Sequence, residues 1–275
     1  MLDILKAIIF GIVEGITEWL PISSTGHLII MEELLKLNQG DAFFEMFQVV
    51  IQLGAILAVV VIYFHKLNPF SPKKTQKQKM MTWQIWIKVI IGCLPAGVVG
   101  LLFDDWIDKV LYHWYVVALM LIVYGILFIV VENYQKGKTP QVTKFSQLTI
   151  PMILIIGVFQ MLAMIPGTSR SGATIVGALM IGVSRSLAAE YTFFLAIPVM
   201  FGASLLKLIK FGFNFTAMQA AVLLVGMVVS FAVSIVAIKF LMNYIRKNDF
   251  KVFGYYRIVL GVIVFLFFGI QALLA

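Results

Sequence analysis

The residues best suited to chemistry gather between positions 14 and 27, a short stretch with two carboxylates, four hydroxyls and an imidazole. Glu14 and Glu18 are four residues apart, so on a helix both carboxylates face the same side. In apolar surroundings an ionised carboxylate needs a cation, a shared proton or water. We therefore expect this pair to hold a divalent metal ion or to act as a general base.

The same stretch ends in a predicted phosphate-binding site at the start of a second helix. Its members are small or polar and precede an imidazole: Ser23, Ser24, Thr25, Gly26 and then His27. The free N–H groups and the dipole of a helix N-terminus attract anions, and capping alone accounts for only one serine or threonine. His27 lies three residues after Ser24, so a helical turn would bring them together as base and nucleophile.

A second polar stretch interrupts an apolar run near residue 170. It repeats the hydroxyl and glycine pattern and adds a guanidinium: Thr168, Ser169, Arg170, Ser171 and Gly172. Arginine's planar fork suits phosphate oxygens better than lysine's point charge, and glycine lets the backbone approach an oxyanion closely. Together the two stretches predict a phosphate cradle, in which Arg170 is also the fixed partner for the two glutamates.

The two stretches belong to an internal repeat with a shift of 146 residues. The shift pairs Gly11 with Gly157 and Glu14 with Gln160, and it superposes the two serine-containing breaks. Each copy places a helix, a proline-containing break and a short helix ahead of three spans, and the odd number of crossings inverts the second copy. Inverted repeats bring their broken helices together near the membrane midplane. The alternative is a chance likeness of two Gly/Ser-rich breaks, against which the matching order of later elements argues.

The composition indicates an integral membrane protein. Of its 275 residues, 61% are hydrophobic and 12% charged, with a mean hydropathy of +1.01, whereas soluble domains are about 25% charged. Runs long enough to cross about 30 Å of hydrocarbon occupy residues 43–64, 83–103, 112–131, 187–209, 217–244 and 253–274. The runs at 4–20 and 148–165 end at the polar breaks, which suggests re-entrant hairpins. The sequence predicts an all-α polytopic membrane protein of about ten helices, with two inverted-topology repeats that each hold a re-entrant helix pair and three transmembrane helices.

Basic residues set the predicted orientation. Eleven of the 21 lysines and arginines lie in three short loops, near residues 66–79, 136–144 and 246–251. Such loops are retained in the cytoplasm, so the formal net charge of +8 is an orientation signal and not a sign of nucleic-acid binding. We therefore expect both termini outside, and an acidic turn on the outer side at residues 104–108.

These assignments give a single integral membrane domain over residues 1–275. Within it the repeat predicts three parts, which are repeat one (1–132), a cytoplasmic linker (133–147) and repeat two (148–275).

With these motifs identified, the sequence resembles the bacitracin-resistance type of undecaprenyl-pyrophosphate phosphatase over essentially the whole chain. Residues 14–27 look like that family's glutamate-rich motif with its SSTGH extension, and residues 166–172 look like its PGxSRSG motif. The resemblance implies an enzyme of the bacterial plasma membrane, open to the outer face, that removes the terminal phosphate of undecaprenyl pyrophosphate. The product would be the lipid carrier for peptidoglycan and other envelope polymers.

The resemblance also implies site roles and a cofactor. The implied catalytic residues are Glu14, Glu18, Ser24, His27 and Arg170. The implied cofactor is a divalent metal ion, Mg²⁺ or Ca²⁺. From the residues themselves, our hypothesis is that Glu14 and Glu18 hold this metal or serve as base.

Several alternatives stay open at this point. Ser24 could attack the phosphate with help from His27, or water could attack directly with His27 or a glutamate as base. Inverted repeats with broken helices also build transporters, so a flippase for prenyl-phosphate lipid is an alternative function, and a lipid-binding scaffold is a third. The glutamates could instead face lipid headgroups, His27 could be structural, and the chain could assemble as a homodimer.

Overall fold

The computed structural model describes residues 1–274, without the side chains of residues 104, 105 and 108. Apart from one β-bridge between Val142 and Val183, the regular structure in this part of the chain is helical. Six of its helices are long and apolar enough to cross a membrane: α3 (Asp41–Ile62), α5 (Gln76–Leu111), α6 (Trp114–Gln135), α9 (Arg185–Phe211), α10 (Ala217–Tyr244) and α11 (Lys251–Leu274). The predicted fold class, an all-α polytopic membrane protein, is confirmed.

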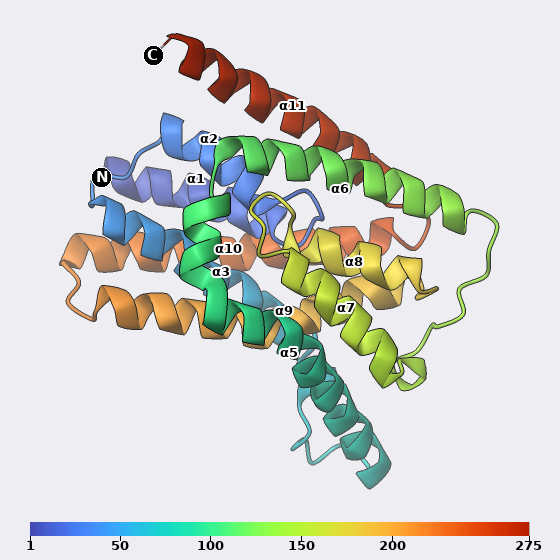
Figure 1. Ribbon diagram of the computed structural model, residues 1–275. Helices are drawn as coiled ribbons and strands as arrows, with labels where there is room; N and C mark the ends of the chain where they lie inside the picture. Colours follow the sequence, from blue (N-terminus) through green and yellow to red (C-terminus); the bar gives the residue numbers. More distant parts are fainter. Residues whose placement is uncertain (275) are drawn as a thin grey trace.

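Two pairs of shorter helices accompany the six spans. One pair is α1 (Leu2–Thr17) and α2 (Ser24–Leu34), and the other is α7 (Ile150–Leu162) and α8 (Arg170–Met180). Each of these helices is too short to cross about 30 Å of hydrocarbon. In Figure 1 the first pair opens toward the end of the bundle that carries the N-terminus, and the second opens toward the opposite end. The remaining elements are one-turn pieces, α4 (Phe64–Leu67) and the 3₁₀ turn η1 (Phe145–Gln147).

The helices pack in a pattern that stays the same when the two halves of the chain are exchanged. Helix α1 packs on α10 and α7 packs on α5, so each first short helix lies on the middle span of the other half. Helix α3 contacts α9, and α6 contacts α11. Helix α8 is the most buried of the short helices, with every residue from Ser171 to Leu179 buried. The broken helices are therefore held inside the protein, as irregular backbone at membrane depth requires.

Small residues allow the closest of these crossings. A Cβ atom added to Gly125 of α6 would lie 2.7 Å from the Gly254 carbonyl oxygen of α11, and the reverse contact is also 2.7 Å. The aligned glycines behave alike, since a Cβ on Gly11 or Gly157 would lie 2.7 or 2.5 Å from a carbonyl oxygen on the partner helix. Transmembrane helices associate closely where small residues face one another. These glycines thus fix how near each short helix lies to its span.

The predicted outer turn at residues 104–108 is wrong, because α5 continues without interruption to Leu111. None of the residues there is a proline or glycine, so nothing local ends the helix. The helix has 36 residues and Pro95 in its interior, and Figure 1 shows it bending along its length. The boundaries of the two repeats and of the linker stay a prediction.

Candidate active site

The two polar stretches that interrupt the helices, at residues 14–27 and 166–172, are called the first and the second break below. They meet at the side chain and the backbone carbonyl of Glu18. Arg170 Nη2 donates to Glu18 Oε1 over 2.9 Å, and both side chains are about nine-tenths buried. Ser171 Oγ donates to the Glu18 carbonyl oxygen over 3.1 Å. Arg170 is further fixed by a 2.8 Å bond from Nη1 to the Thr192 carbonyl oxygen, and its guanidinium lies 5.8 Å from the Trp19 ring centroid. The predicted partnership of arginine and carboxylate is present, with Glu18 as the carboxylate.

Ser24 reaches the same carboxylate from the other side. Its Oγ donates to Glu18 Oε2 over 3.3 Å, so each carboxylate oxygen of Glu18 accepts from a different break. A carboxylate that accepts a serine hydroxyl proton is placed to act as its general base. Glu18 therefore stands between a hydroxyl that is a candidate nucleophile and a cation.

The backbone at the two breaks has the same unusual conformation. Ser23 has φ 75° and Ser169 has φ 69°, and these are the two non-glycine residues with positive φ in residues 1–274. Each serine caps the helix that follows, since the amide of Gly26 donates to Ser23 Oγ over 3.3 Å and that of Gly172 to Ser169 Oγ over 3.2 Å. Strained conformations of this kind are kept where the surroundings over-determine them, often at functional sites. Both helix N-termini, α2 and α8, are thereby aimed at the meeting point of the breaks.

A cavity of about 900 Å³ opens beside this cluster. Five of the predicted site residues lie on its wall: Glu18, Ser24, Thr25, Ser169 and Arg170. Further polar side chains continue the wall along α2, α3 and α9: Glu32, Glu45, Gln48, Gln52, Lys207 and Lys210. Apolar residues of α3, α5 and α9 complete it, so the cavity combines an anion site with a surface for hydrocarbon.

Seven of the predicted site residues are not on the cavity wall: Glu14, Ser23, Gly26, His27, Thr168, Ser171 and Gly172. Ser23 and Ser171 are fully buried and serve the backbone and Glu18, respectively. Thr168 is also fully buried, and its hydroxyl has no hydrogen-bond partner among the described residues. In this conformation these residues pack behind the cavity wall and do not face the cavity.

His27 is held away from Ser24, contrary to the predicted base–nucleophile pair. Its Nδ1 lies 2.7 Å from the Ser23 carbonyl oxygen and its Nε2 lies 2.7 Å from the Tyr256 hydroxyl, on which the ring also stacks. Because a carbonyl only accepts, Nδ1 carries the proton, and Nε2 of the neutral ring accepts from Tyr256. Both ring nitrogens are occupied, so Ser24 turns to Glu18 instead.

The surroundings of the Glu14 carboxylate indicate whether this site could hold a metal ion. Its side chain is 0% exposed, and neither carboxylate oxygen has a hydrogen-bond partner among the described residues. A carboxylate that is buried without a hydrogen-bond partner either binds a cation or takes up a proton. Among those same residues there is no cluster of three or more His, Cys, Asp or Glu side chains that could hold an ion. Two carboxylates suit a magnesium-type ion whose other ligands are phosphate oxygens and water. Only Glu18 of the pair faces the cavity in this conformation, with Glu14 buried behind it.

Arg257 of α11 is a site residue that the sequence reasoning missed. Its side chain is 0% exposed, and its Nη2 donates to the carbonyl oxygens of Gly167 and Thr168 over 2.9 and 2.8 Å. Its Nη1 donates to the Pro21 carbonyl oxygen over 3.4 Å, so one guanidinium joins the two breaks. The sequence signal that could have identified it is a single arginine within the apolar run 253–274, since charged residues at membrane depth usually have a structural or functional partner.

The geometry can be set beside known proteins. The family model described as bacitracin resistance protein BacA matches residues 7–263. The protein named undecaprenyl-diphosphatase from Desulfitobacterium hafniense is 62% identical over 275 residues, which covers 100% of this chain and 99% of that relative. Relatives with the same name from Acetivibrio thermocellus and Enterococcus faecalis are 61% and 59% identical, and they cover 98% and 94% of this chain and 98% and 95% of their own lengths.

Proposed function

This chain belongs to the bacitracin resistance protein BacA family, and on that premise we propose that its central cavity is the catalytic site. The chain is a multi-pass membrane phosphatase that hydrolyses undecaprenyl pyrophosphate to undecaprenyl phosphate and inorganic phosphate. The product lipid is the carrier for peptidoglycan and other envelope polymers, and its recycling underlies the resistance for which the family is named.

One observation carries the assignment of the site. Glu18 accepts hydrogen bonds from Ser24 of the first break and from Arg170 of the second, at 3.3 and 2.9 Å. Phosphoryl transfer needs mainly positioning and charge neutralisation, and these three side chains supply a nucleophile, a base and a cation. The guanidinium has five N–H donors, and its contacts with Thr192 and Glu18 leave donors for a phosphate.

In the reaction we propose, Arg170 and the N-termini of α2 and α8 hold the terminal phosphate. Ser24 Oγ bonds to its phosphorus as the bridging P–O bond breaks, and Glu18 takes the serine proton. Undecaprenyl phosphate leaves, and water then hydrolyses the phosphoserine to free phosphate. The prenyl tail lies on the apolar cavity wall, which includes Val49, Leu101 and Leu206.

Direct attack by water is the rival mechanism. In that case Glu18 orients and deprotonates water, and Ser24 only binds phosphate. Acid quenching of a reaction with labelled substrate distinguishes the two, because only the first traps phosphate on Ser24. Absence of a trapped intermediate at every time point of a single turnover supports the second, since an oxygen of water enters the phosphate in both mechanisms.

We also propose a divalent metal ion, Mg²⁺ or Ca²⁺, with Glu14 and Glu18 as its protein ligands. Because Glu14 lies behind the cavity wall in this conformation, its side chain would have to turn toward the cavity for the same ion to meet the pyrophosphate. When bound it would neutralise charge on the phosphates. The unpartnered carboxylate of Glu14 supports this proposal. An activity that EDTA leaves unchanged would remove the metal from the scheme.

For localisation we propose the bacterial plasma membrane, with both termini outside and the cavity open to the outer face. The three basic loops support this orientation. Labelling of single cysteines introduced at residue 2 and in the basic loop near residue 138 tests it in intact cells. Assembly as a homodimer stays a prediction.

The decisive experiment measures phosphate release from undecaprenyl pyrophosphate by purified protein in detergent, with and without added metal. Wild type should release phosphate, and Ser24→Ala should lose nearly all of that activity while eluting as a folded protein. A flippase or a scaffold would release none. Full activity in folded Ser24→Ala would exclude the serine as nucleophile and leave the water mechanism.

A further inference from the structure

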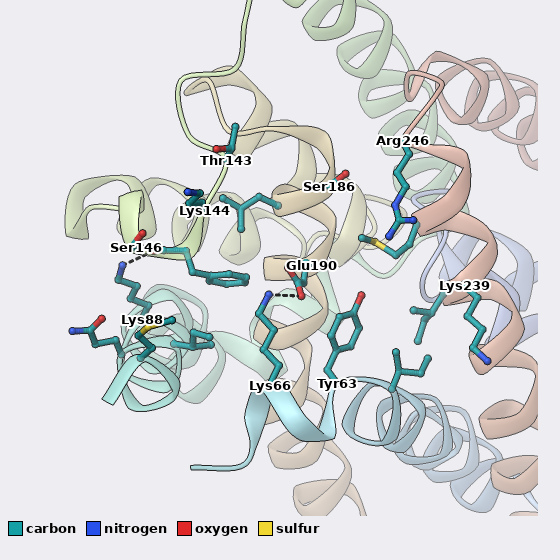
Figure 2. A pocket seen from close by; sticks show the side chains of 18 of the residues that line it. Tyr63, Lys66, Lys88, Thr143, Lys144, Ser146, Ser186, Glu190, Lys239 and Arg246 are labelled. Atoms are coloured by element: carbon teal, nitrogen blue, oxygen red, sulfur yellow. Dashed lines mark hydrogen bonds and ion pairs between the residues drawn. The ribbon is translucent and has the colours of Figure 1, made fainter. Parts of the chain in front are cut away.

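A second cavity, of about 800 Å³, is lined by residues of the basic loops and of the adjoining helix ends (Figure 2). Helix α9 links the two, since Glu190 in its second turn lines the second cavity and Lys207 in its last turns lines the first. The linings of the two cavities come nearest along α9 at Glu190 and Pro198, which are eight residues, or about 12 Å of helix, apart. The second cavity is therefore separate from the catalytic one.

The second cavity is basic. Its wall has five cationic side chains and one carboxylate: Lys66, Lys88, Lys144, Lys239, Arg246 and Glu190. The Lys66 ammonium pairs with Glu190 at 2.7 Å, and Lys88 donates to the Phe145 carbonyl oxygen over 2.6 Å. Neither Lys144 nor Arg246 has an ion-pair partner among the described side chains. The cavity thus keeps an uncompensated positive charge.

These cations converge from separate parts of the chain. Lys66 belongs to α4, Lys144 to the linker before η1, and Arg246 to the turn after α10. Figure 2 shows the Arg246 side chain reaching toward the Lys66–Glu190 pair, with the Tyr63 hydroxyl beside them. All three predicted cytoplasmic loops therefore contribute a cation to the second cavity. Basic residues that served only to orient the protein in the membrane would not need to converge in this way.

Neutral donors accompany the cations. Hydroxyls of Tyr63, Thr143, Ser146 and Ser186 line the same cavity. A tyrosine hydroxyl keeps its proton near neutral pH, so Tyr63 is a donor in this cavity. Cations combined with hydroxyl donors bind phosphate oxygens in proteins.

The remaining walls are apolar and come from the spans. Ile62, Ile85, Leu187, Ile238 and Met242 lie on α3, α5, α9 and α10. A free anion would gain nothing from these side chains, whereas a lipid would bury its glycerol and first methylenes against them. We propose that this cavity binds the phosphate headgroup of an anionic lipid, with Arg246 and Lys144 as its charged ligands.

Native mass spectrometry of the full chain in neutral detergent tests the proposal, with phosphatidic acid as the probe. Wild type should retain one phosphatidic acid molecule, and Arg246→Gln should weaken that binding by about tenfold, the effect of one charge-assisted hydrogen bond. Lys247→Gln is the matched control, because the neighbouring exposed lysine carries the same charge and does not line the cavity. Equal binding by both variants would overturn the proposal.

Two further arms identify the source of the phosphate. Inorganic phosphate in large excess should not displace the lipid, and displacement at millimolar concentration would show that the cavity takes the free anion instead. Hydrolysis of undecaprenyl pyrophosphate should be unchanged in Arg246→Gln, since Arg246 lines the second cavity and not the one that contains Glu18. Loss of lipid binding with full phosphatase activity would support the second site independently of the catalytic proposal.

Discussion

The two breaks have the same backbone conformation but carry different functional side chains. Ser23 and Ser169 have the same positive φ and cap the next helix through the same bond. The residue after each cap differs, with a hydroxyl at Ser24 and a guanidinium at Arg170. Both side chains bond to the Glu18 carboxylate, which only the first break provides. The duplicated motif thus becomes an asymmetric site, in which one copy supplies a carboxylate and a hydroxyl and the other supplies the cation.

The largest effect should come from the carboxylate that both breaks share. Glu18→Gln keeps the size of the side chain but removes the base and the partner of Arg170, so kcat should fall by about 10³-fold or more. Glu45→Gln, on the same cavity wall but away from the breaks, is the control and should lose far less. A folded Glu18→Gln protein with near-wild-type turnover would break the comparison.

Arg170→Lys should come next, with a loss of about 10²-fold in kcat. The lysine keeps the positive charge but cannot bond Glu18, the Thr192 carbonyl and a phosphate at once. Steady-state phosphate release measures the effect. Equal activity of the lysine and arginine enzymes would reduce the second break to a simple positive charge.

Arg257→Met should remove the hydrogen bonds through which one guanidinium connects the two breaks. It leaves the buried carbonyls of Gly167 and Thr168 without their donor, at a cost of about 1–3 kcal/mol each. We expect a lower thermal midpoint in detergent and a reduced kcat. Lys251→Met, on the same helix but away from the breaks, should change neither.

His27→Gln should lower kcat by less than about tenfold, because the imidazole contacts Ser23 and Tyr256 and not Ser24. Tyr256→Phe should have a similarly small effect. A loss in His27→Gln as large as that in Glu18→Gln would restore the histidine as the base of the first break.

The smallest effect should come from the caps, and it should be the same in both breaks. Ser23→Ala and Ser169→Ala each remove a capping bond, worth about 1 kcal/mol, and leave alanine at an unfavourable positive φ. The glycine variants should be milder, since glycine adopts positive φ without strain. Thermal midpoints of the four variants measure this, and a clear difference between the two alanine variants would mean that the backbones are not equivalent.

The sequence predicted the parts of this site that depend on local chemistry. The polar stretches, the capping serines and the arginine opposite the glutamates follow from residue types and short spacings. Glu18, Ser24 and Arg170 do meet, because the repeat implies that the breaks approach one another. The predicted contact between His27 and Ser24 is not present in the structure. Helical spacing says that His27 can reach Ser24, but not that Tyr256 offers its ring a better partner.

What the sequence alone determined is therefore the class of protein, the six spans, the two breaks and the residues on which catalysis is proposed to depend. Those features follow from the length of apolar runs and from local capping, which operate over a few residues. Only the tertiary structure decided that Arg257 joins the breaks, that Glu14 lies behind the cavity and that three basic loops form a second hollow. A helix that is apolar on every side does not reveal which face meets which neighbour, so these contacts depend on packing across the whole bundle.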